Sequence, residues 1–135
     1  MKVKKSLLTV LLSLVIAFMS TSYCFAQTGS AYTSIGSIGG YSVQGYLIIS
    51  SYNAEVKTGY VSITGQPKAY FGYNVTANYR NIETGVASYR SGSYNNESLG
   101  VGGSFSAPSN CVFTSGNSYH SAYLSGQSWS ADLNL

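Results

Sequence analysis

The sequence predicts an all-β protein, folded as a single-domain antiparallel β-sandwich of about seven or eight strands. Apolar and polar residues alternate along several short segments, and turn-forming residues separate these segments at intervals of about ten residues. After residue 26, no window shows apolar residues at helical spacing. A small β-barrel would share these features and is the alternative architecture.

Residues 1–26 have the three parts of a secretory signal peptide. An almost unbroken apolar stretch covers residues 7–19, and the small residues Cys24 and Ala26 form a cleavage pattern before Gln27. The basic start consists of Lys2, Lys4 and Lys5. The apolar stretch, at about 13 residues, is shorter than the roughly 20 that a membrane-spanning helix needs. We therefore expect a compact, bacterial type of leader that is cleaved, and a secreted domain at 27–135.

The first half of this domain holds the weaker strand patterns. Residues 27–40 are rich in Ser and Gly and predict either a frayed arm or a weak first strand. Strands are expected at 41–50 and 56–64, because apolar residues recur there with a period of two. The side chains expected to point inward are Tyr41, Val43, Leu47 and Ile49 in the former, and Val61 and Ile63 in the latter.

The clearest strand pattern covers residues 69–80. Its odd-numbered positions, from Ala69 to Tyr79, are all apolar or aromatic, whereas most even-numbered positions are polar. Side chains alternate across a strand, so this segment has one apolar and one wet face. Further strands are expected at 86–94, 99–107, 119–125 and 128–135. Turns are expected between the strands, at 65–67, 81–85, 95–96, 108–110, 116–117 and 126–127.

The charge and cysteine content limit the classes of partner that the domain can bind and the states open to Cys111. The whole chain carries a formal charge of +3, but after loss of the leader its cations and anions balance. These charges are Lys57, Lys68, Arg80 and Arg90 against Glu55, Glu83, Glu97 and Asp132. Isolated cations do not form a nucleic-acid or anionic-membrane surface, so neither partner is expected. Cys111 is then the one remaining cysteine, as a buried small hydrophobe, a free thiol or an intermolecular bridge.

Few side chains of the domain suit catalysis or metal binding, and we predict a non-enzymatic protein without metal or cofactor. His120 shares its strand parity with Ala122 and Leu124, which indicates a partly buried, hydrogen-bonded histidine. A Ser-His-Asp set with Asp132 is formally possible, but no Gly-x-Ser-x-Gly motif is present. Among the carboxylates, Glu83 and Glu97 flank a predicted strand and lie about 30 Å apart. Glu55 with Asp132 stays open.

The remaining signal is a set of tyrosines expected to point outward among Ser, Asn and Thr. These residues are Tyr46, Tyr60, Tyr70, Tyr119 and Tyr123. Tyrosine gives a large contact area at small entropic cost, and its ring can stack on sugar faces, but it is also simply a good strand residue.

Three functions are compatible with this composition. The first is a secreted, non-catalytic binding module for a glycan, a cell-wall polymer or a protein, acting through the tyrosine-bearing face. The second is a small bacteriocin-like antagonist. The third is a surface protein that associates with itself, because low net charge and open strand edges do not oppose association.

Overall fold

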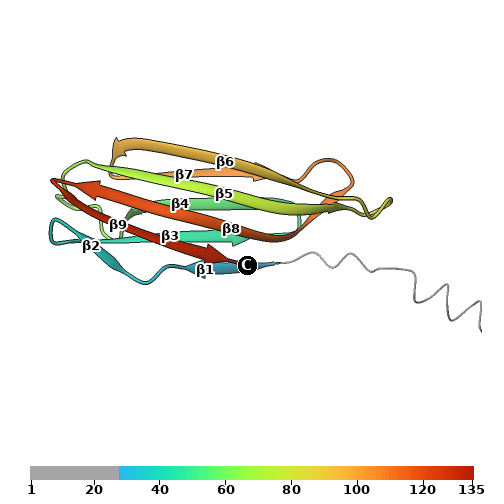
Figure 1. Cartoon of the computed structure of the whole chain (residues 1–135), viewed down its shortest axis with the longest axis horizontal. Coiled ribbons are helices and arrows are strands. Elements are labelled where there is room, and N and C mark those ends of the chain that lie inside the picture. The colour runs from blue at the N-terminus through green and yellow to red at the C-terminus, as the bar shows by residue number, and fades with distance from the viewer. Residues whose placement is uncertain (1–27) are drawn as a thin grey trace, which may run out of the picture.

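The structure is a computed structural model that describes residues 28–135, and it shows two antiparallel β-sheets packed face to face (Figure 1). The predicted β-sandwich is confirmed. The barrel alternative is wrong, because the strands form two separate sheets rather than one closed sheet. The leader predicted at 1–26 lies outside the described residues.

The first sheet is built around β3 (Tyr41–Ile49), which pairs with β4 (Asn53–Tyr60). On its other side β3 pairs with β1 (Gly29–Tyr32) and β2 (Gly36–Ile38), and β4 pairs with β7 (Gly100–Ser106). The segment expected as an arm or a single weak strand therefore forms two short strands. Both of them lie along the same edge of β3.

The second sheet has the order β6-β5-β8-β9. It consists of β5 (Ala69–Asn81), β6 (Ala87–Ser98), β8 (Cys111–Leu124) and β9 (Gln127–Asn134). The hairpin between β8 and β9 turns at Ser125 and Gly126, which both have positive φ (50° and 83°). Two successive positive φ values fit a tight two-residue hairpin turn, and such a turn fixes the register of the pair.

Two predicted turns are wrong, because the structure places them inside strands. Residues 95–96 continue β6, which pairs without interruption as far as Ser98. Residues 116–117 lie in the middle of β8, which begins at Cys111 rather than at 119. Gly116 is needed there for space, since a Cβ at this position would overlap the Ile49 side chain from the facing sheet. A glycine that suggests a turn is here a packing residue.

The predicted inward positions of the second strand are also wrong. β4 ends at Tyr60, and Val61 and Ile63 are exposed in the connection to β5. The inward side chains of β4 occupy the opposite parity. They are Ala54, Val56, Thr58 and Tyr60.

The space between the sheets contains two apolar clusters. One centres on Leu47, Ile49 and Phe113, and the other on Val43 and Phe71. Cys111 is buried and carries a free thiol. Core packing of this kind, rather than cross-links, is what stabilises the described part of the chain.

Glycines of one sheet accommodate bulky side chains of the other. A Cβ at Gly45 would overlap the ring of His120, and a Cβ at Gly103 would overlap the Tyr73 hydroxyl. At the sandwich edge, Gly36 lies beneath the Trp129 ring in the same way. The two sheets therefore fit together by size, a large residue on one against a glycine on the other.

Candidate functional site

The outer face of the β6-β5-β8-β9 sheet carries an almost continuous set of hydroxyl and amide side chains. Residues that are direct partners across antiparallel strands point to the same face, so the register defines this surface. We call it the tyrosine face. It consists of Tyr89, Ser91, Ser93, Asn95 and Glu97 on β6, Tyr70, Gly72, Asn74, Thr76 and Asn78 on β5, Ser115, Asn117, Tyr119, Ser121 and Tyr123 on β8, and Ser128, Ser130, Asp132 and Asn134 on β9.

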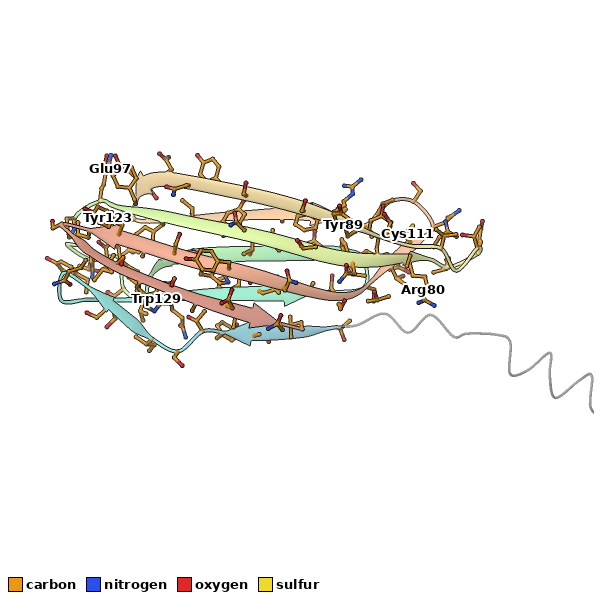
Figure 2. All side chains as sticks on the ribbon, viewed as in Figure 1. Arg80, Tyr89, Glu97, Cys111, Tyr123 and Trp129 are labelled. Atoms are coloured by element: carbon orange, nitrogen blue, oxygen red, sulfur yellow. The ribbon has the colours of Figure 1, made fainter. Side chains whose placement is uncertain are left out.

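Three of the predicted tyrosines lie on this face. Tyr70 and Tyr123 are direct cross-strand partners, 51% and 49% exposed. Tyr119 is four residues from Tyr123 on the same strand, about 13 Å away at the usual rise of a strand, and is 40% exposed. Figure 2 shows Tyr123 and Glu97 at one end of the sheet and Tyr89 further towards the other end. The face thus presents aromatic rings at separated points along its length.

The floor between these rings is hollowed at Gly72. Gly72 has no side chain, and the Ser121 hydroxyl and the Asn95 amide lie close above it. A Cβ on Gly72 would lie 2.9 Å from the first and 3.3 Å from the second. Two shallow depressions, of about 370 and 240 Å³, meet at Asn95, Tyr119 and Ser121. A third of about 460 Å³ lies on the other side of Tyr119, towards Asp132. Tyr119 therefore stands between hollows lined by polar groups.

Tyr46 is separated from these residues by the whole thickness of the sandwich. It lies on the outer face of the first sheet, where its ring is 5.9 Å from that of Tyr32. Its hydroxyl donates a 2.5 Å hydrogen bond to Glu55 Oε1. Burial raises the pKa of Tyr46 to about 12, with the neighbouring Glu55 carboxylate acting in the same direction. The Tyr46 hydroxyl is thus engaged within the protein.

Tyr60 does not point outward, and this prediction is wrong. The residue is only 8% exposed. Its ring packs edge-on against those of Phe71 and Tyr41, with ring centroids 4.9 Å and 5.8 Å apart. Its hydroxyl has no hydrogen-bond partner among residues 28–135. Burial raises the pKa of Tyr60, since the charged phenolate is poorly solvated in the core. Tyr60 is a core residue.

His120 is more deeply buried than expected, at 0% exposure, and is hydrogen bonded as expected. Its Nδ1 lies 2.8 Å from Thr58 Oγ1, and its Nε2 lies 2.7 Å from Ser118 Oγ. Burial lowers the pKa of His120 to about 4, against a smaller opposite effect of Asp132. The neutral ring joins the two sheets, because Thr58 belongs to β4 and Ser118 to β8.

The acidic residues are dispersed over the structure. Glu55 and Asp132, the pair left open by the sequence, lie on the outer faces of opposite sheets. Glu83 lies in the β5–β6 turn, whereas Glu97 is near the far end of β6, so the strand separates them as predicted. Among residues 28–135, no three His, Cys, Asp or Glu side chains gather in a way that would hold a metal ion.

Comparison with known proteins gives no relative: no protein-family model, curated protein or solved structure matches the chain. Between residues 28 and 135, no helix has the length and apolar character required to span a membrane.

Several residues of the tyrosine face were not found from the sequence. Tyr89 is 64% exposed on β6, and Gly72, Asn95 and Ser121 form the hollow beside Tyr119. Strand parity gives the direction of Gly72 on β5 and Ser121 on β8, whereas β6 has no buried face and its pattern gives no direction for Tyr89 and Asn95. Their convergence depends on strand order and register, and these are set by contacts between distant segments.

Proposed function

We propose that the protein is an exported, non-catalytic binding module that recognises an extended, uncharged glycan through the tyrosine face. The observation that carries this proposal is the placement of Tyr70, Tyr119 and Tyr123 on one sheet surface around hollows lined by hydroxyl and amide groups.

The aromatic rings are suited to the apolar faces of sugar rings. Half-exposed tyrosines offer flat carbon surfaces, and their two side-chain torsions cost little entropy when they are fixed. The separation of about 13 Å between Tyr119 and the Tyr70–Tyr123 pair favours a polymer over a single sugar, because one small ring cannot contact both. A long, shallow surface with several separated rings supports binding of a chain.

The polar groups between the rings favour a sugar over a protein or a charged ligand. Serine, threonine and asparagine side chains both donate and accept hydrogen bonds, as sugar hydroxyls do. The charged positions of the face are Glu97 and Asp132, which lie on the outer strands β6 and β9. A stable protein interface would need a fully buried apolar centre, and the middle of this face is polar.

The first experiment compares binding of soluble and insoluble polysaccharides, including bacterial wall polymers, by the chain from Gln27 onward and by its variants. The double substitution Tyr70→Ala, Tyr119→Ala removes two ring contacts and is expected to weaken glycan binding by at least about tenfold. Tyr52→Ala is the matched control. Tyr52 is also an exposed tyrosine, but it lies between β3 and β4, away from the tyrosine face.

Two results would contradict this proposal. One is the absence of any retained glycan or wall polymer, and the other is a double variant that binds as tightly as the parent chain. Inhibition of bacterial growth by the purified protein, with no glycan bound, would instead favour the antagonist function.

A further inference from the structure

β6 is an edge strand that is exposed on both of its faces. Every residue from Ala87 to Glu97 is exposed, and Ser98 at the end is half-buried. Its partner is β5, and it forms the upper border of the molecule in Figure 1. The face directed to the core side carries Arg90 and Tyr94, and the Tyr94 side chain remains half exposed there. The strand therefore lies largely beyond the part of its sheet that the facing sheet covers.

The hydrogen-bond pattern shows which backbone groups of β6 are free. The Asn81 N–H donates to the Val86 carbonyl at 2.9 Å, so this pair is a hydrogen-bonded one. Hydrogen-bonded pairs alternate in an antiparallel ladder, and even-numbered residues of β6 therefore bond to β5. Odd-numbered residues, including Ser91 and Ser93, direct their N–H and C=O groups to the open edge. The Glu97 N–H fits this pattern, since it is satisfied locally by Asn96 Oδ1 at 2.9 Å.

β6 lacks most of the features that protect sheet edges. It has 12 residues, contains neither proline nor lysine, and pairs with β5 without a bulge. The remaining edges of the described sheets are different. β1 and β2 are short, with 4 and 3 residues, and β7 and β9 have 7 and 8. Arg90 is the one protective charge directed to the core side of β6.

We propose that β6 pairs antiparallel with β6 of a second copy of this chain, so that the two four-stranded sheets join into one. A two-fold axis through Ser93 brings almost the whole of both strands together. Tyr89 then lies opposite Glu97 of the other copy, Ser91 opposite Asn95, and Arg90 opposite Asn96. No like charges oppose each other in this register, and the charges of residues 28–135 sum to zero, which favours a second copy as the occupant.

The consequence for the surface is that two tyrosine faces lie side by side. Antiparallel pairing about an axis perpendicular to the sheet keeps outer residues on the same side. A dimer would therefore present a doubled face, and a polymer could contact both halves at once. The pairing itself depends on backbone groups of β6 and not on the proposed glycan.

The test is sedimentation equilibrium of the chain from Gln27 onward, at low micromolar to submillimolar concentration. We expect a concentration-dependent monomer–dimer equilibrium. Ser93→Pro removes an N–H that β5 does not use, so it should leave the fold intact and raise the dimer dissociation constant at least about tenfold. Ser93→Thr is the matched control, since it keeps the N–H and a hydroxyl at the same position.

Ser93→Lys provides a second test that does not alter the backbone. It places two ammonium groups opposite each other at the axis, and dimerisation should weaken, more strongly at low salt. Circular dichroism and thermal unfolding verify that each variant is folded. A monomer at all concentrations would overturn the proposal, and so would association that neither substitution at Ser93 changes.

Discussion

At the scale of single residues, His120 has the most unusual environment. It is fully buried between the sheets, and a hydroxyl group lies at each of its ring nitrogens. A neutral imidazole donates through one nitrogen and accepts through the other, and hydroxyls from Thr58 and Ser118 can satisfy both. Protonation is disfavoured because the charged ring would lose its solvation, and this is why the pKa falls to about 4.

This pKa makes stability depend on pH. The unfolded chain binds a proton at His120 near pH 6.5, whereas the folded protein does so only near pH 4. The contribution of the neutral His120 ring to stability is therefore fully present above about pH 6.5, and it is lost as the pH falls towards 4. Between pH 7 and pH 5, above the range in which ordinary carboxylates titrate, we expect a loss of about 2 kcal/mol in urea unfolding.

His120→Gln supplies the control for this prediction, since glutamine keeps hydrogen-bonding groups but does not titrate. At pH 7 the variant should be less stable than the parent chain. Its own free energy of unfolding should change little between pH 7 and pH 5. An equal loss in the parent chain and in His120→Gln would show that the pH dependence arises elsewhere.

Strand parity was the one basis on which the sequence predicted five outward tyrosines, and three of them lie together on one surface. Tyr70, Tyr119 and Tyr123 alternate with inward residues on β5 and β8, and they do point outward. Tyr60 failed for a connected reason: because Val61 and Ile63 were placed inward, the residue before them had to point outward. Val61 and Ile63 come after the last residue of β4, so their spacing of two residues does not reflect the alternation of the strand.

At the scale of elements, strand prediction succeeded where one face is covered and the other is wet. β5 and β9 have this alternation along most of their length, and their bounds lie within about one residue of the expected ones. β6 has no buried face, so its pattern gave no sign that it continues through Asn95 and Asn96 to Ser98. β8 was shortened because Gly116 and Asn117 resemble a turn, whereas Gly116 makes space for Ile49.

Packing of glycine against a large residue predicts a specific energetic coupling between the sheets. Gly45→Ala should destabilise the parent protein by about 1 to 3 kcal/mol, because the new methyl overlaps the His120 ring. The same substitution should cost much less in a His120→Ala background, where the ring is absent. Denaturant unfolding of the four proteins in this double-mutant cycle measures the coupling.

Gly92→Ala is the matched control for this cycle. Gly92 also lies within a strand, but an added Cβ would meet only Val75 Cγ1, at 4.0 Å. It should be neutral or slightly stabilising, because alanine restricts the unfolded chain. Additive effects of Gly45→Ala and His120→Ala would show that the two residues are not in contact.

At the scale of the whole molecule, the two outer surfaces differ in kind. The first sheet turns Tyr46 outward with its hydroxyl held by Glu55, and its outer β7 positions include Gly100 and Gly102. The second sheet presents a broad set of hydroxyl and amide groups with separated aromatic rings. This asymmetry is our reason for proposing binding at the second sheet. The open edge of β6 lies beside the tyrosine face.

Amide chemical-shift mapping with a retained polysaccharide fragment tests the central claim most directly. We expect the shifts to concentrate at Gly72, Asn95, Tyr119 and Ser121, and the outer face of the β1-β3-β4-β7 sheet to stay unchanged. Shifts centred on Tyr46 and Lys57, or spread evenly over both sheets, would contradict it.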